Sequence, residues 1–95
     1  MEQGPHDYTR LTSANNFKTG PGVLRALVLE TDGTNAATAT VVDATSGSTP
    51  VIAELASPGA GPDDRREYAG GIAFSDGLRL AAITGTGAAV VAVYD

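Results

Sequence analysis

The chain lacks cysteine and tryptophan, and only five of its 95 residues are aromatic. The absence of cysteine excludes the disulfides that often support a small fold, and no metal-ligand pattern is evident in their place. Oligomerisation is then the remaining support, and we expect it here. The scarcity of aromatic rings also weakens any interpretation as a sugar-binding protein, because such proteins stack ring faces on sugars.

Basic residues are also few: six Lys and Arg stand against 11 Asp and Glu, for a formal net charge of −5. Nucleic-acid binding depends on clustered basic residues, and none cluster beyond Arg65-Arg66. We therefore expect no nucleic-acid partner.

Long apolar runs are missing as well. The longest, residues 88–94, has seven residues, whereas a membrane helix needs about 20. The first residues have neither the basic nor the apolar segment of a signal peptide. We expect no membrane span and no secretion signal, and the absence of cysteine fits synthesis in a reducing cytoplasm.

Small residues are abundant: Ala and Gly together number 28, against 20 Val, Leu, Ile and Phe. That second class lies just above the level of roughly 20% below which chains tend to be disordered. The predicted core is therefore thin, and a chain of this size buries only about 60–65% of its unfolded surface.

Short runs of β-formers separated by turn residues predict an all-β fold. Strands are predicted at residues 23–30, 36–43, 51–56, 65–74, 78–83 and 88–94, with one or two more near 8–11 and 16–19. Turns recur every 8–14 residues, which is typical of a small antiparallel β-sandwich of six to eight short strands. Jelly-roll and immunoglobulin-like topologies both remain open.

Local patterns give finer expectations. Alternation in residues 36–43 places Thr38, Thr40 and Val42 on one face of a strand. Gly70-Gly71 inside a predicted strand indicates a bulge or a close backbone approach. Tyr68, Ile72 and Phe74 are expected to share one face of that strand.

The domain organisation is expected to be simple. Residues 1–10 form a flexible polar arm and residues 11–95 a single β-sandwich domain. Residues 57–64 are rich in Pro and Gly and form the best candidate for a mobile loop.

Few residues suggest catalysis or metal binding. His6 is the only histidine, and it lies in the polar arm, where a triad could not be held rigid. The acidic residues lack the spaced pattern of a calcium loop, and Arg65-Arg66 should neutralise Asp63-Asp64. The other groups that could contribute to a cation site are Glu67, Asp32, Asn35 and Asp43, but solvated charges are the better interpretation of them.

Two further patterns do not predict a site. Gly85-Thr86-Gly87 resembles the start of a dinucleotide fingerprint but lacks the helix that must follow, so these glycines are expected to serve a hairpin. Glu54 and Glu67 would be the candidate glycosidase pair, without an aromatic-lined cleft to support them. We expect no enzyme, no cofactor and no metal.

Two arginines interrupt otherwise apolar strands, Arg25 and Arg79. Each fits either a solvent-facing position or a subunit interface, where Arg is enriched. The candidate contacts with a partner or a second subunit are Tyr8, Arg10, Arg25, Tyr68 and Arg79.

Several segments together carry a resemblance. They are the entry at residues 11–24 (LTSANNFKTGPGVL), the Thr/Ala-rich strand at 37–43, Val51-Ile52-Ala53, the turn at 74–78 (FSDGL), and 84–88 (TGTGA) with a closing Val-rich strand. This pattern resembles small β-sandwich proteins encoded among phage and prophage virion genes, similar to capsid decoration (cement) proteins and spike or fibre-base proteins.

The resemblance implies a structural virion protein made in the host cytoplasm and bound to a capsid or spike as a homo-oligomer, with a trimer favoured. It implies no catalytic residues. The alternative is a carbohydrate- or receptor-binding module of a fibre or adhesin, with an exposed Tyr68 beside the 57–64 loop as its site.

Overall fold

The computed structural model describes residues 7–60 and 63–95, which contain eight strands and no helix. The strands are β1 (Asp7–Leu11), β2 (Asn15–Thr19), β3 (Gly22–Glu30), β4 (Ala37–Val42), β5 (Val51–Ser57), β6 (Asp64–Phe74), β7 (Gly77–Thr84) and β8 (Ala89–Tyr94). All six predicted strands are confirmed, and both weaker segments form strands as well.

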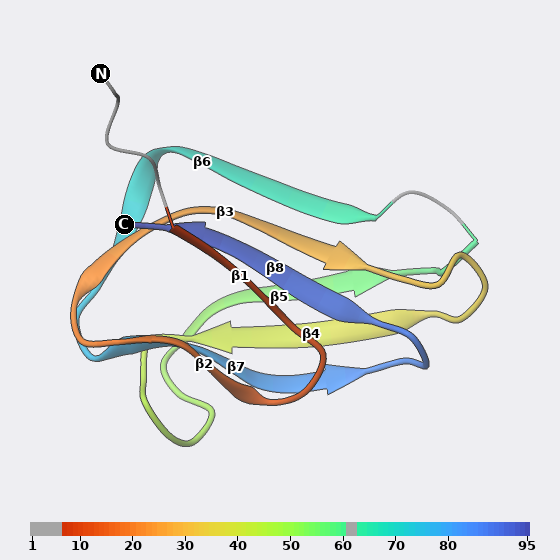
Figure 1. The fold of residues 1–95 in the computed structure, drawn as a ribbon, viewed down its shortest axis with the longest axis horizontal. Helices are drawn as coiled ribbons and strands as arrows, with labels where there is room; N and C mark the ends of the chain where they lie inside the picture. Colours follow the sequence, from red (N-terminus) through yellow and green to blue (C-terminus); the bar gives the residue numbers. More distant parts are fainter. Residues whose placement is uncertain (1–6, 61–62) are drawn as a thin grey trace.

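The strands form two four-stranded antiparallel sheets, ordered β1-β8-β3-β6 and β2-β7-β4-β5 (Figure 1). The all-β sandwich is therefore confirmed. This order is the jelly-roll arrangement of eight strands in two sheets. An immunoglobulin-like sandwich has a different strand order, ABED against CFG, so the topology selects between the two alternatives.

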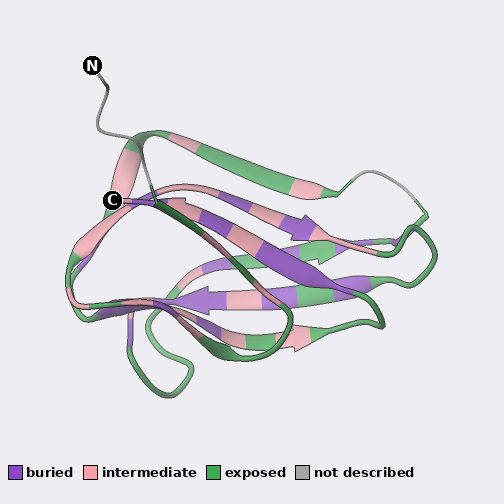
Figure 2. Cartoon of the chain, viewed as in Figure 1, coloured by how far each residue is buried: buried purple, intermediate pink, exposed green. Residues whose placement is uncertain are grey.

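The core lies between the sheets and is formed by alternate residues of their strands. The largest fully buried side chains are Leu24, Leu27, Leu29, Val41, Val42, Leu55, Leu78, Leu80 and Val90. Phe17, Phe74 and Tyr94 join the core as its aromatic members. Figure 2 shows buried segments along β8, near the middle of its sheet, and a largely exposed first half of β6 at the sheet's edge.

In β4 the predicted alternation holds for most of the strand, with Ala37, Ala39 and Val41 buried and Thr38 exposed. Val42 was expected on the face of Thr38, and that expectation is wrong: its side chain is fully buried. The pairing of β4 shifts register on both sides of Val41, which changes the direction of the last residue.

The predicted bulge at Gly70-Gly71 is confirmed. Leu24 of β3 pairs with Ile72 of β6, and Ala26 pairs with Glu67, so residues 68–71 lie opposite Arg25 alone. Gly71 has a φ of 76°, which favours glycine. Tyr68 and Ile72 pack against the core that contains Phe74, as the predicted common face requires.

Two expected irregular segments are more ordered than predicted. Residues 7–10 of the expected arm belong to β1 and pair with β8, while residues 1–6 lie outside the described part. In the expected mobile loop, Ser57 and Gly59 are buried, and the Thr31 hydroxyl donates to the Gly59 carbonyl at 3.3 Å. Residues 61–62 are outside the described part.

Candidate functional site

The two central strands of the β1–β8–β3–β6 sheet are apolar on both of their faces. On the inner face Leu27, Leu29 and Val90 are completely buried. On the opposite side, here named the outer face, the apolar side chains are half-buried; they are Ala26, Val28, Val91 and Val93. Cross-strand partners share a face, and the register pairs Val28 with Val91 and Ala26 with Val93. The outer face therefore carries a continuous apolar stripe across β3 and β8.

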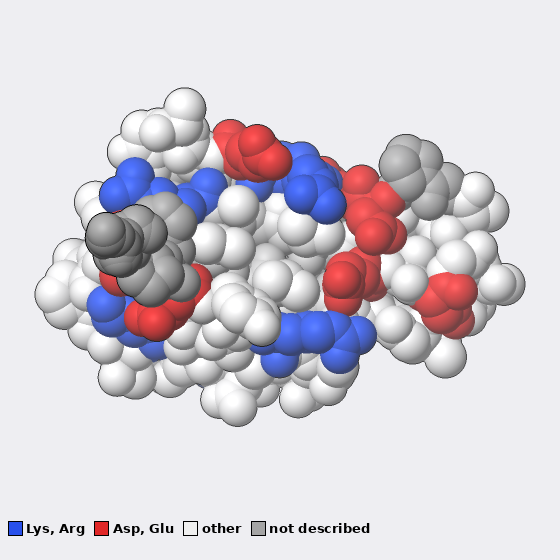
Figure 3. All heavy atoms as spheres, turned by 45° about the horizontal axis from the view of Figure 1, so that its top comes forward, with Lys and Arg blue, Asp and Glu red and all other residues white. Residues whose placement is uncertain are grey.

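Charges of both signs surround this stripe. Three ion pairs lie there: Arg10–Glu30 at 2.9 Å, Arg25–Asp95 at 2.8 Å and Arg65–Glu67 at 4.0 Å. Figure 3 shows uncharged atoms bordered by blue and red side chains in this region. Because these pairs are exposed or half-exposed, each contributes little to stability. An apolar centre with a charged rim is the usual anatomy of an interaction surface.

The outer face also has a protruding side chain, Tyr8, and a hollow. Tyr8 is 74% exposed, the most exposed large hydrophobic side chain described, and it pairs with Val93 across β1 and β8. A hollow of about 480 Å³ is lined by Arg25, Ala26, Glu67, Tyr68, Ala69 and Val93. It lies where the bulge of β6 faces Arg25 on β3.

Four of the five candidate contact residues lie at or beside this face: Tyr8, Arg10, Arg25 and Tyr68. Arg79 lies in the other sheet, where it donates to the Gly47 carbonyl and the Asn16 side chain, each at 3.1 Å. It therefore holds a loop and an edge strand of that sheet.

Tyr68 differs from the exposed residue that the receptor-binding alternative expected. It is half-buried and packs against the core. Burial raises the pKa of its hydroxyl above the ordinary value, with Arg66 opposing this shift. Its side chain therefore packs inward and does not project from the surface, although the residue also lines the hollow.

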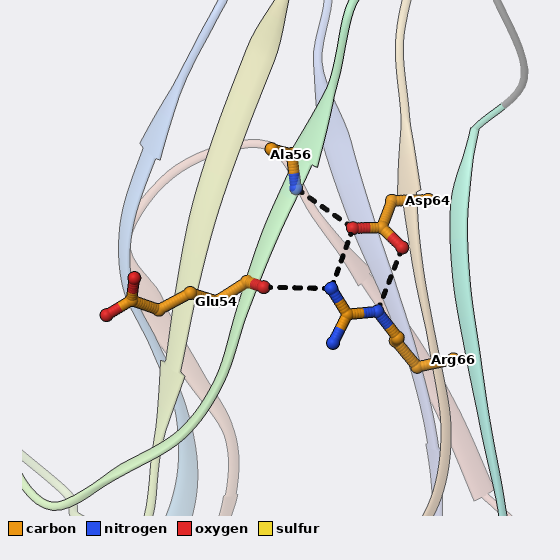
Figure 4. A network of polar contacts seen from close by, with 4 residues as sticks. All are labelled: Glu54, Ala56, Asp64 and Arg66. Carbon is orange, nitrogen blue, oxygen red and sulfur yellow. Dashed lines mark hydrogen bonds and ion pairs between the residues drawn. The ribbon is translucent and has the colours of Figure 1, made fainter.

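Asp64 and Arg66 of β6 form hydrogen bonds to the backbone of β5 and so link the edge strands of the two sheets (Figure 4). Arg66 Nε donates to Asp64 Oδ1 at 2.9 Å, and its Nη2 donates to the Glu54 carbonyl at 3.1 Å. Asp64 Oδ2 accepts from the Ala56 amide at 2.9 Å. The side-chain bond from Arg66 is the main cause that lowers the pKa of Asp64. The expected neutralisation of Asp63-Asp64 by Arg65-Arg66 is confirmed for Asp64 and Arg66. Arg65 pairs with Glu67 instead.

The remaining acidic candidates for a cation site hold backbone turns. Asp43 accepts from the amides of Ser75 and Asp76 at about 3 Å, which lowers its pKa. Asp32 accepts from the amides of Thr34 and Asn35 at 2.9 and 2.8 Å, and its pKa is lowered chiefly by the Asn35 bond. Within residues 7–60 and 63–95, no group of three or more His, Cys, Asp or Glu gathers in a way that could hold a metal ion.

The structure also decides the outcome for the glutamate pair and the glycine-rich segment. Glu54 lines a shallow hollow on the β4–β5 pair, whereas Glu67 lies on the outer face of the other sheet, so the two carboxylates share no cleft. Gly85 and Gly87 have φ values of 110° and 75°, as expected of turn glycines. The expected hairpin is wrong, because β7 and β8 belong to different sheets and the connection crosses from one sheet to the other. His6 lies outside the described residues.

The described chain contains no helix with the length and hydropathy that a membrane crossing requires.

The apolar stripe is the feature that sequence reasoning missed. Its signal was present, because residues 26–29 and 88–94 are uninterrupted apolar runs. A strand buried on both faces has such a run, whereas a strand with one solvated face alternates.

Comparisons with protein-family models, curated proteins and solved structures gave no match.

Proposed function

We propose that this protein is a structural component of a virus particle that binds the particle surface as a homo-oligomer. The apolar stripe on the outer face carries this proposal. Val28, Val91 and Val93 are only half-buried in the isolated chain, although their strands have the composition of strands covered on both faces. A partner surface would complete that burial.

The topology and the charge support the same proposal. Jelly rolls occur in viral capsid proteins as well as in lectins and cupins, so the fold is compatible with the proposal and the outer face carries it. A net charge of −5 helps a small protein stay soluble at a high copy number. The thin core gains stability when an apolar face is covered by another protein.

Co-sedimentation with purified particles tests the proposal. The protein should travel with the particle peak in a density gradient, and mass spectrometry should find many copies per particle. Val91→Arg on the apolar stripe should reduce this association at least tenfold, while Thr40→Arg on the opposite sheet should retain it. Absence of the wild-type protein from the particle peak overturns the proposal.

The hollow beside Tyr68 favours a second candidate, a carbohydrate- or receptor-binding module. The hollow is lined by Arg25, Glu67 and Tyr68, and a concave site with a few polar groups of this kind can bind a ligand. A glycan array with the wild-type protein and Tyr68→Ala discriminates the two. Specific binding that Tyr68→Ala abolishes supports this candidate, and flat binding by both proteins removes it.

A further inference from the structure

The strand register arranges the side chains of this sheet in rows that cross all four strands. One inward-facing row crosses the sheet as Thr9, Ala92, Leu27 and Arg66. An outward-facing row lies on each side of it: Tyr8, Val93, Ala26 and Glu67 on one side, and Arg10, Val91, Val28 and Arg65 on the other. Each strand therefore contributes one residue to each outward row.

We propose that a second copy of this chain covers the outer face through a twofold axis in the plane of the contact. The axis runs perpendicular to the strands, at the level of the inward row through Leu27 and Ala92. Such an axis lays each strand antiparallel over its own counterpart and exchanges the two outward rows. Val93 then meets Val91 of the second copy, and Ala26 meets Val28, so that the apolar stripe covers itself.

The charged rim matches under the same operation. Glu67 lies over Arg65 of the second copy, and Arg65 over its Glu67, so one pairing is made twice, as in any isologous contact. Tyr8 lies over Arg10 of the second copy, where a guanidinium can stack on the ring. Arg25 points towards Glu30 of the second copy. Glu30 is the next outward-facing residue of β3 after Val28.

The overall charge balance supports a second copy as the occupant. The outer face carries Arg10, Arg25 and Arg65 against Glu30, Glu67 and Asp95. These six charges cancel, so the net charge of −5 is carried by the rest of the chain. Two copies can therefore approach through this face without the like-charge repulsion that their other surfaces impose.

This inference rests on the homo-oligomeric part of the proposed function and specifies its contact. A twofold contact builds a dimer, so a trimer would require a different surface. Four strands spaced about 4.8 Å apart make a small face, at the lower end of the range for specific interfaces. We expect a dimer that dissociates on dilution.

Charge reversal at the repeated pairing gives a sharp test by size-exclusion chromatography with light scattering. The wild-type protein should have twice the 9.6 kDa mass of the chain. Glu67→Arg and Arg65→Glu should each be monomeric, because each places like charges face to face. Their equimolar mixture should restore the dimer, because residues 65 and 67 then meet opposite charges in the mixed pair. The pairing of Arg65 with Glu67 inside one chain cannot produce that rescue.

Glu54→Arg is the matched control, since it makes the same charge change on the other sheet and should remain dimeric. Circular dichroism checks that each variant is folded. A monomeric or trimeric wild type, failure of the mixture to restore the dimer, or loss of the dimer in the control overturns the inference. A monomer that still co-sediments with particles would remove the twofold contact alone, whereas a dimer absent from particles would remove only the particle role.

Discussion

At the scale of single residues, the Tyr94 hydroxyl connects the two sheets. Tyr94 lies in β8 and is 7% exposed. Its hydroxyl donates to the Phe17 carbonyl of β2 at 3.1 Å and shares a hydrogen bond of 2.8 Å with the Thr9 hydroxyl of β1. One buried group thus satisfies a carbonyl of the opposite sheet, which would otherwise lose its partner at a substantial cost.

Tyr94→Phe should lower the free energy of unfolding by about 1–2 kcal/mol, because it leaves the Phe17 carbonyl and the Thr9 hydroxyl without this partner. Urea unfolding, followed by circular dichroism, measures the effect. Tyr8→Phe removes the same atom from a side chain that is 74% exposed, and its unfolding free energy should stay within about 0.5 kcal/mol of wild type. Equal effects of the two substitutions would contradict the role given to Tyr94.

Asp43 holds the β6–β7 turn from the end of β4. Its carboxylate accepts from three successive amides, those of Ser75, Asp76 and Gly77. Asp43→Ala should lower the free energy of unfolding at pH 7 by about 1–2 kcal/mol, with allowance for solvent exposure. Asp76→Ala, an exposed neighbour in the same turn, should have little effect.

The effect of Asp43 should depend on pH in one direction. The amides of Ser75 and Asp76 lower its pKa in the folded protein, so the folded state binds its proton less readily than the unfolded state. The stabilisation is therefore complete above the unfolded pKa of about 3.9 and is lost as the pH falls through the lower folded value. Urea unfolding from pH 7 to pH 2 should show the difference between wild type and Asp43→Ala shrinking at the acidic end; a constant difference would contradict this account.

At the scale of elements, the bulge in β6 depends on one of two adjacent glycines. Gly71 has a φ of 76°, and a Cβ there would collide with Val23 Cγ1 and lie 3.0 Å from Arg25 Nη1. Gly71→Ala should destabilise the protein by about 1–3 kcal/mol, through both the backbone conformation and the collision.

Gly70→Ala is the control for that substitution, because a Cβ at Gly70 meets nothing within 4 Å. Its thermal midpoint should match or slightly exceed that of wild type. Thermal unfolding of the two variants side by side separates the roles. A Gly71→Ala variant as stable as Gly70→Ala would show that the bulge does not need glycine there.

The edge strand β5 is protected by side chains of β6. The Ala56 amide and the Glu54 carbonyl would otherwise be open to another strand, but Asp64 and Arg66 occupy them. Inward-pointing charges of this kind hinder edge-to-edge aggregation. Self-association is thereby directed away from this edge, in agreement with the contact proposed on the outer face.

At the scale of the whole molecule, the shortage of large apolar residues leads us to expect that stability depends on the proposed association. A dimer that buries the apolar stripe stabilises the folded state by mass action. The thermal midpoint should therefore rise by several degrees between about 1 and 100 µM protein. Glu67→Arg should have a midpoint independent of concentration; a wild-type midpoint that stays constant over this range would contradict the dependence.

The strands and turns of this protein could be predicted because their signals are local. Period-two alternation and Gly, Pro and Asp-Gly turns placed all six strands within about two residues, and Gly70-Gly71 marked the bulge. The candidate contacts with a partner or a second subunit remain predictions. Four of the five came together at one face, while Arg79 lies on the other sheet. The apolar stripe between them was missed.

Sequence alone determined the all-β class, the thin core and the acidic charge, since these follow from composition and from neighbours along the chain. Only the tertiary structure decided the jelly-roll order, because alternation says which residues share a face and not which strands pair. It also brought Asp43 to a turn more than 30 residues away and laid β3 against β8. The outer face exists only through that pairing, since its stripe combines residues from strands that are about 60 positions apart and meet only in the folded sheet.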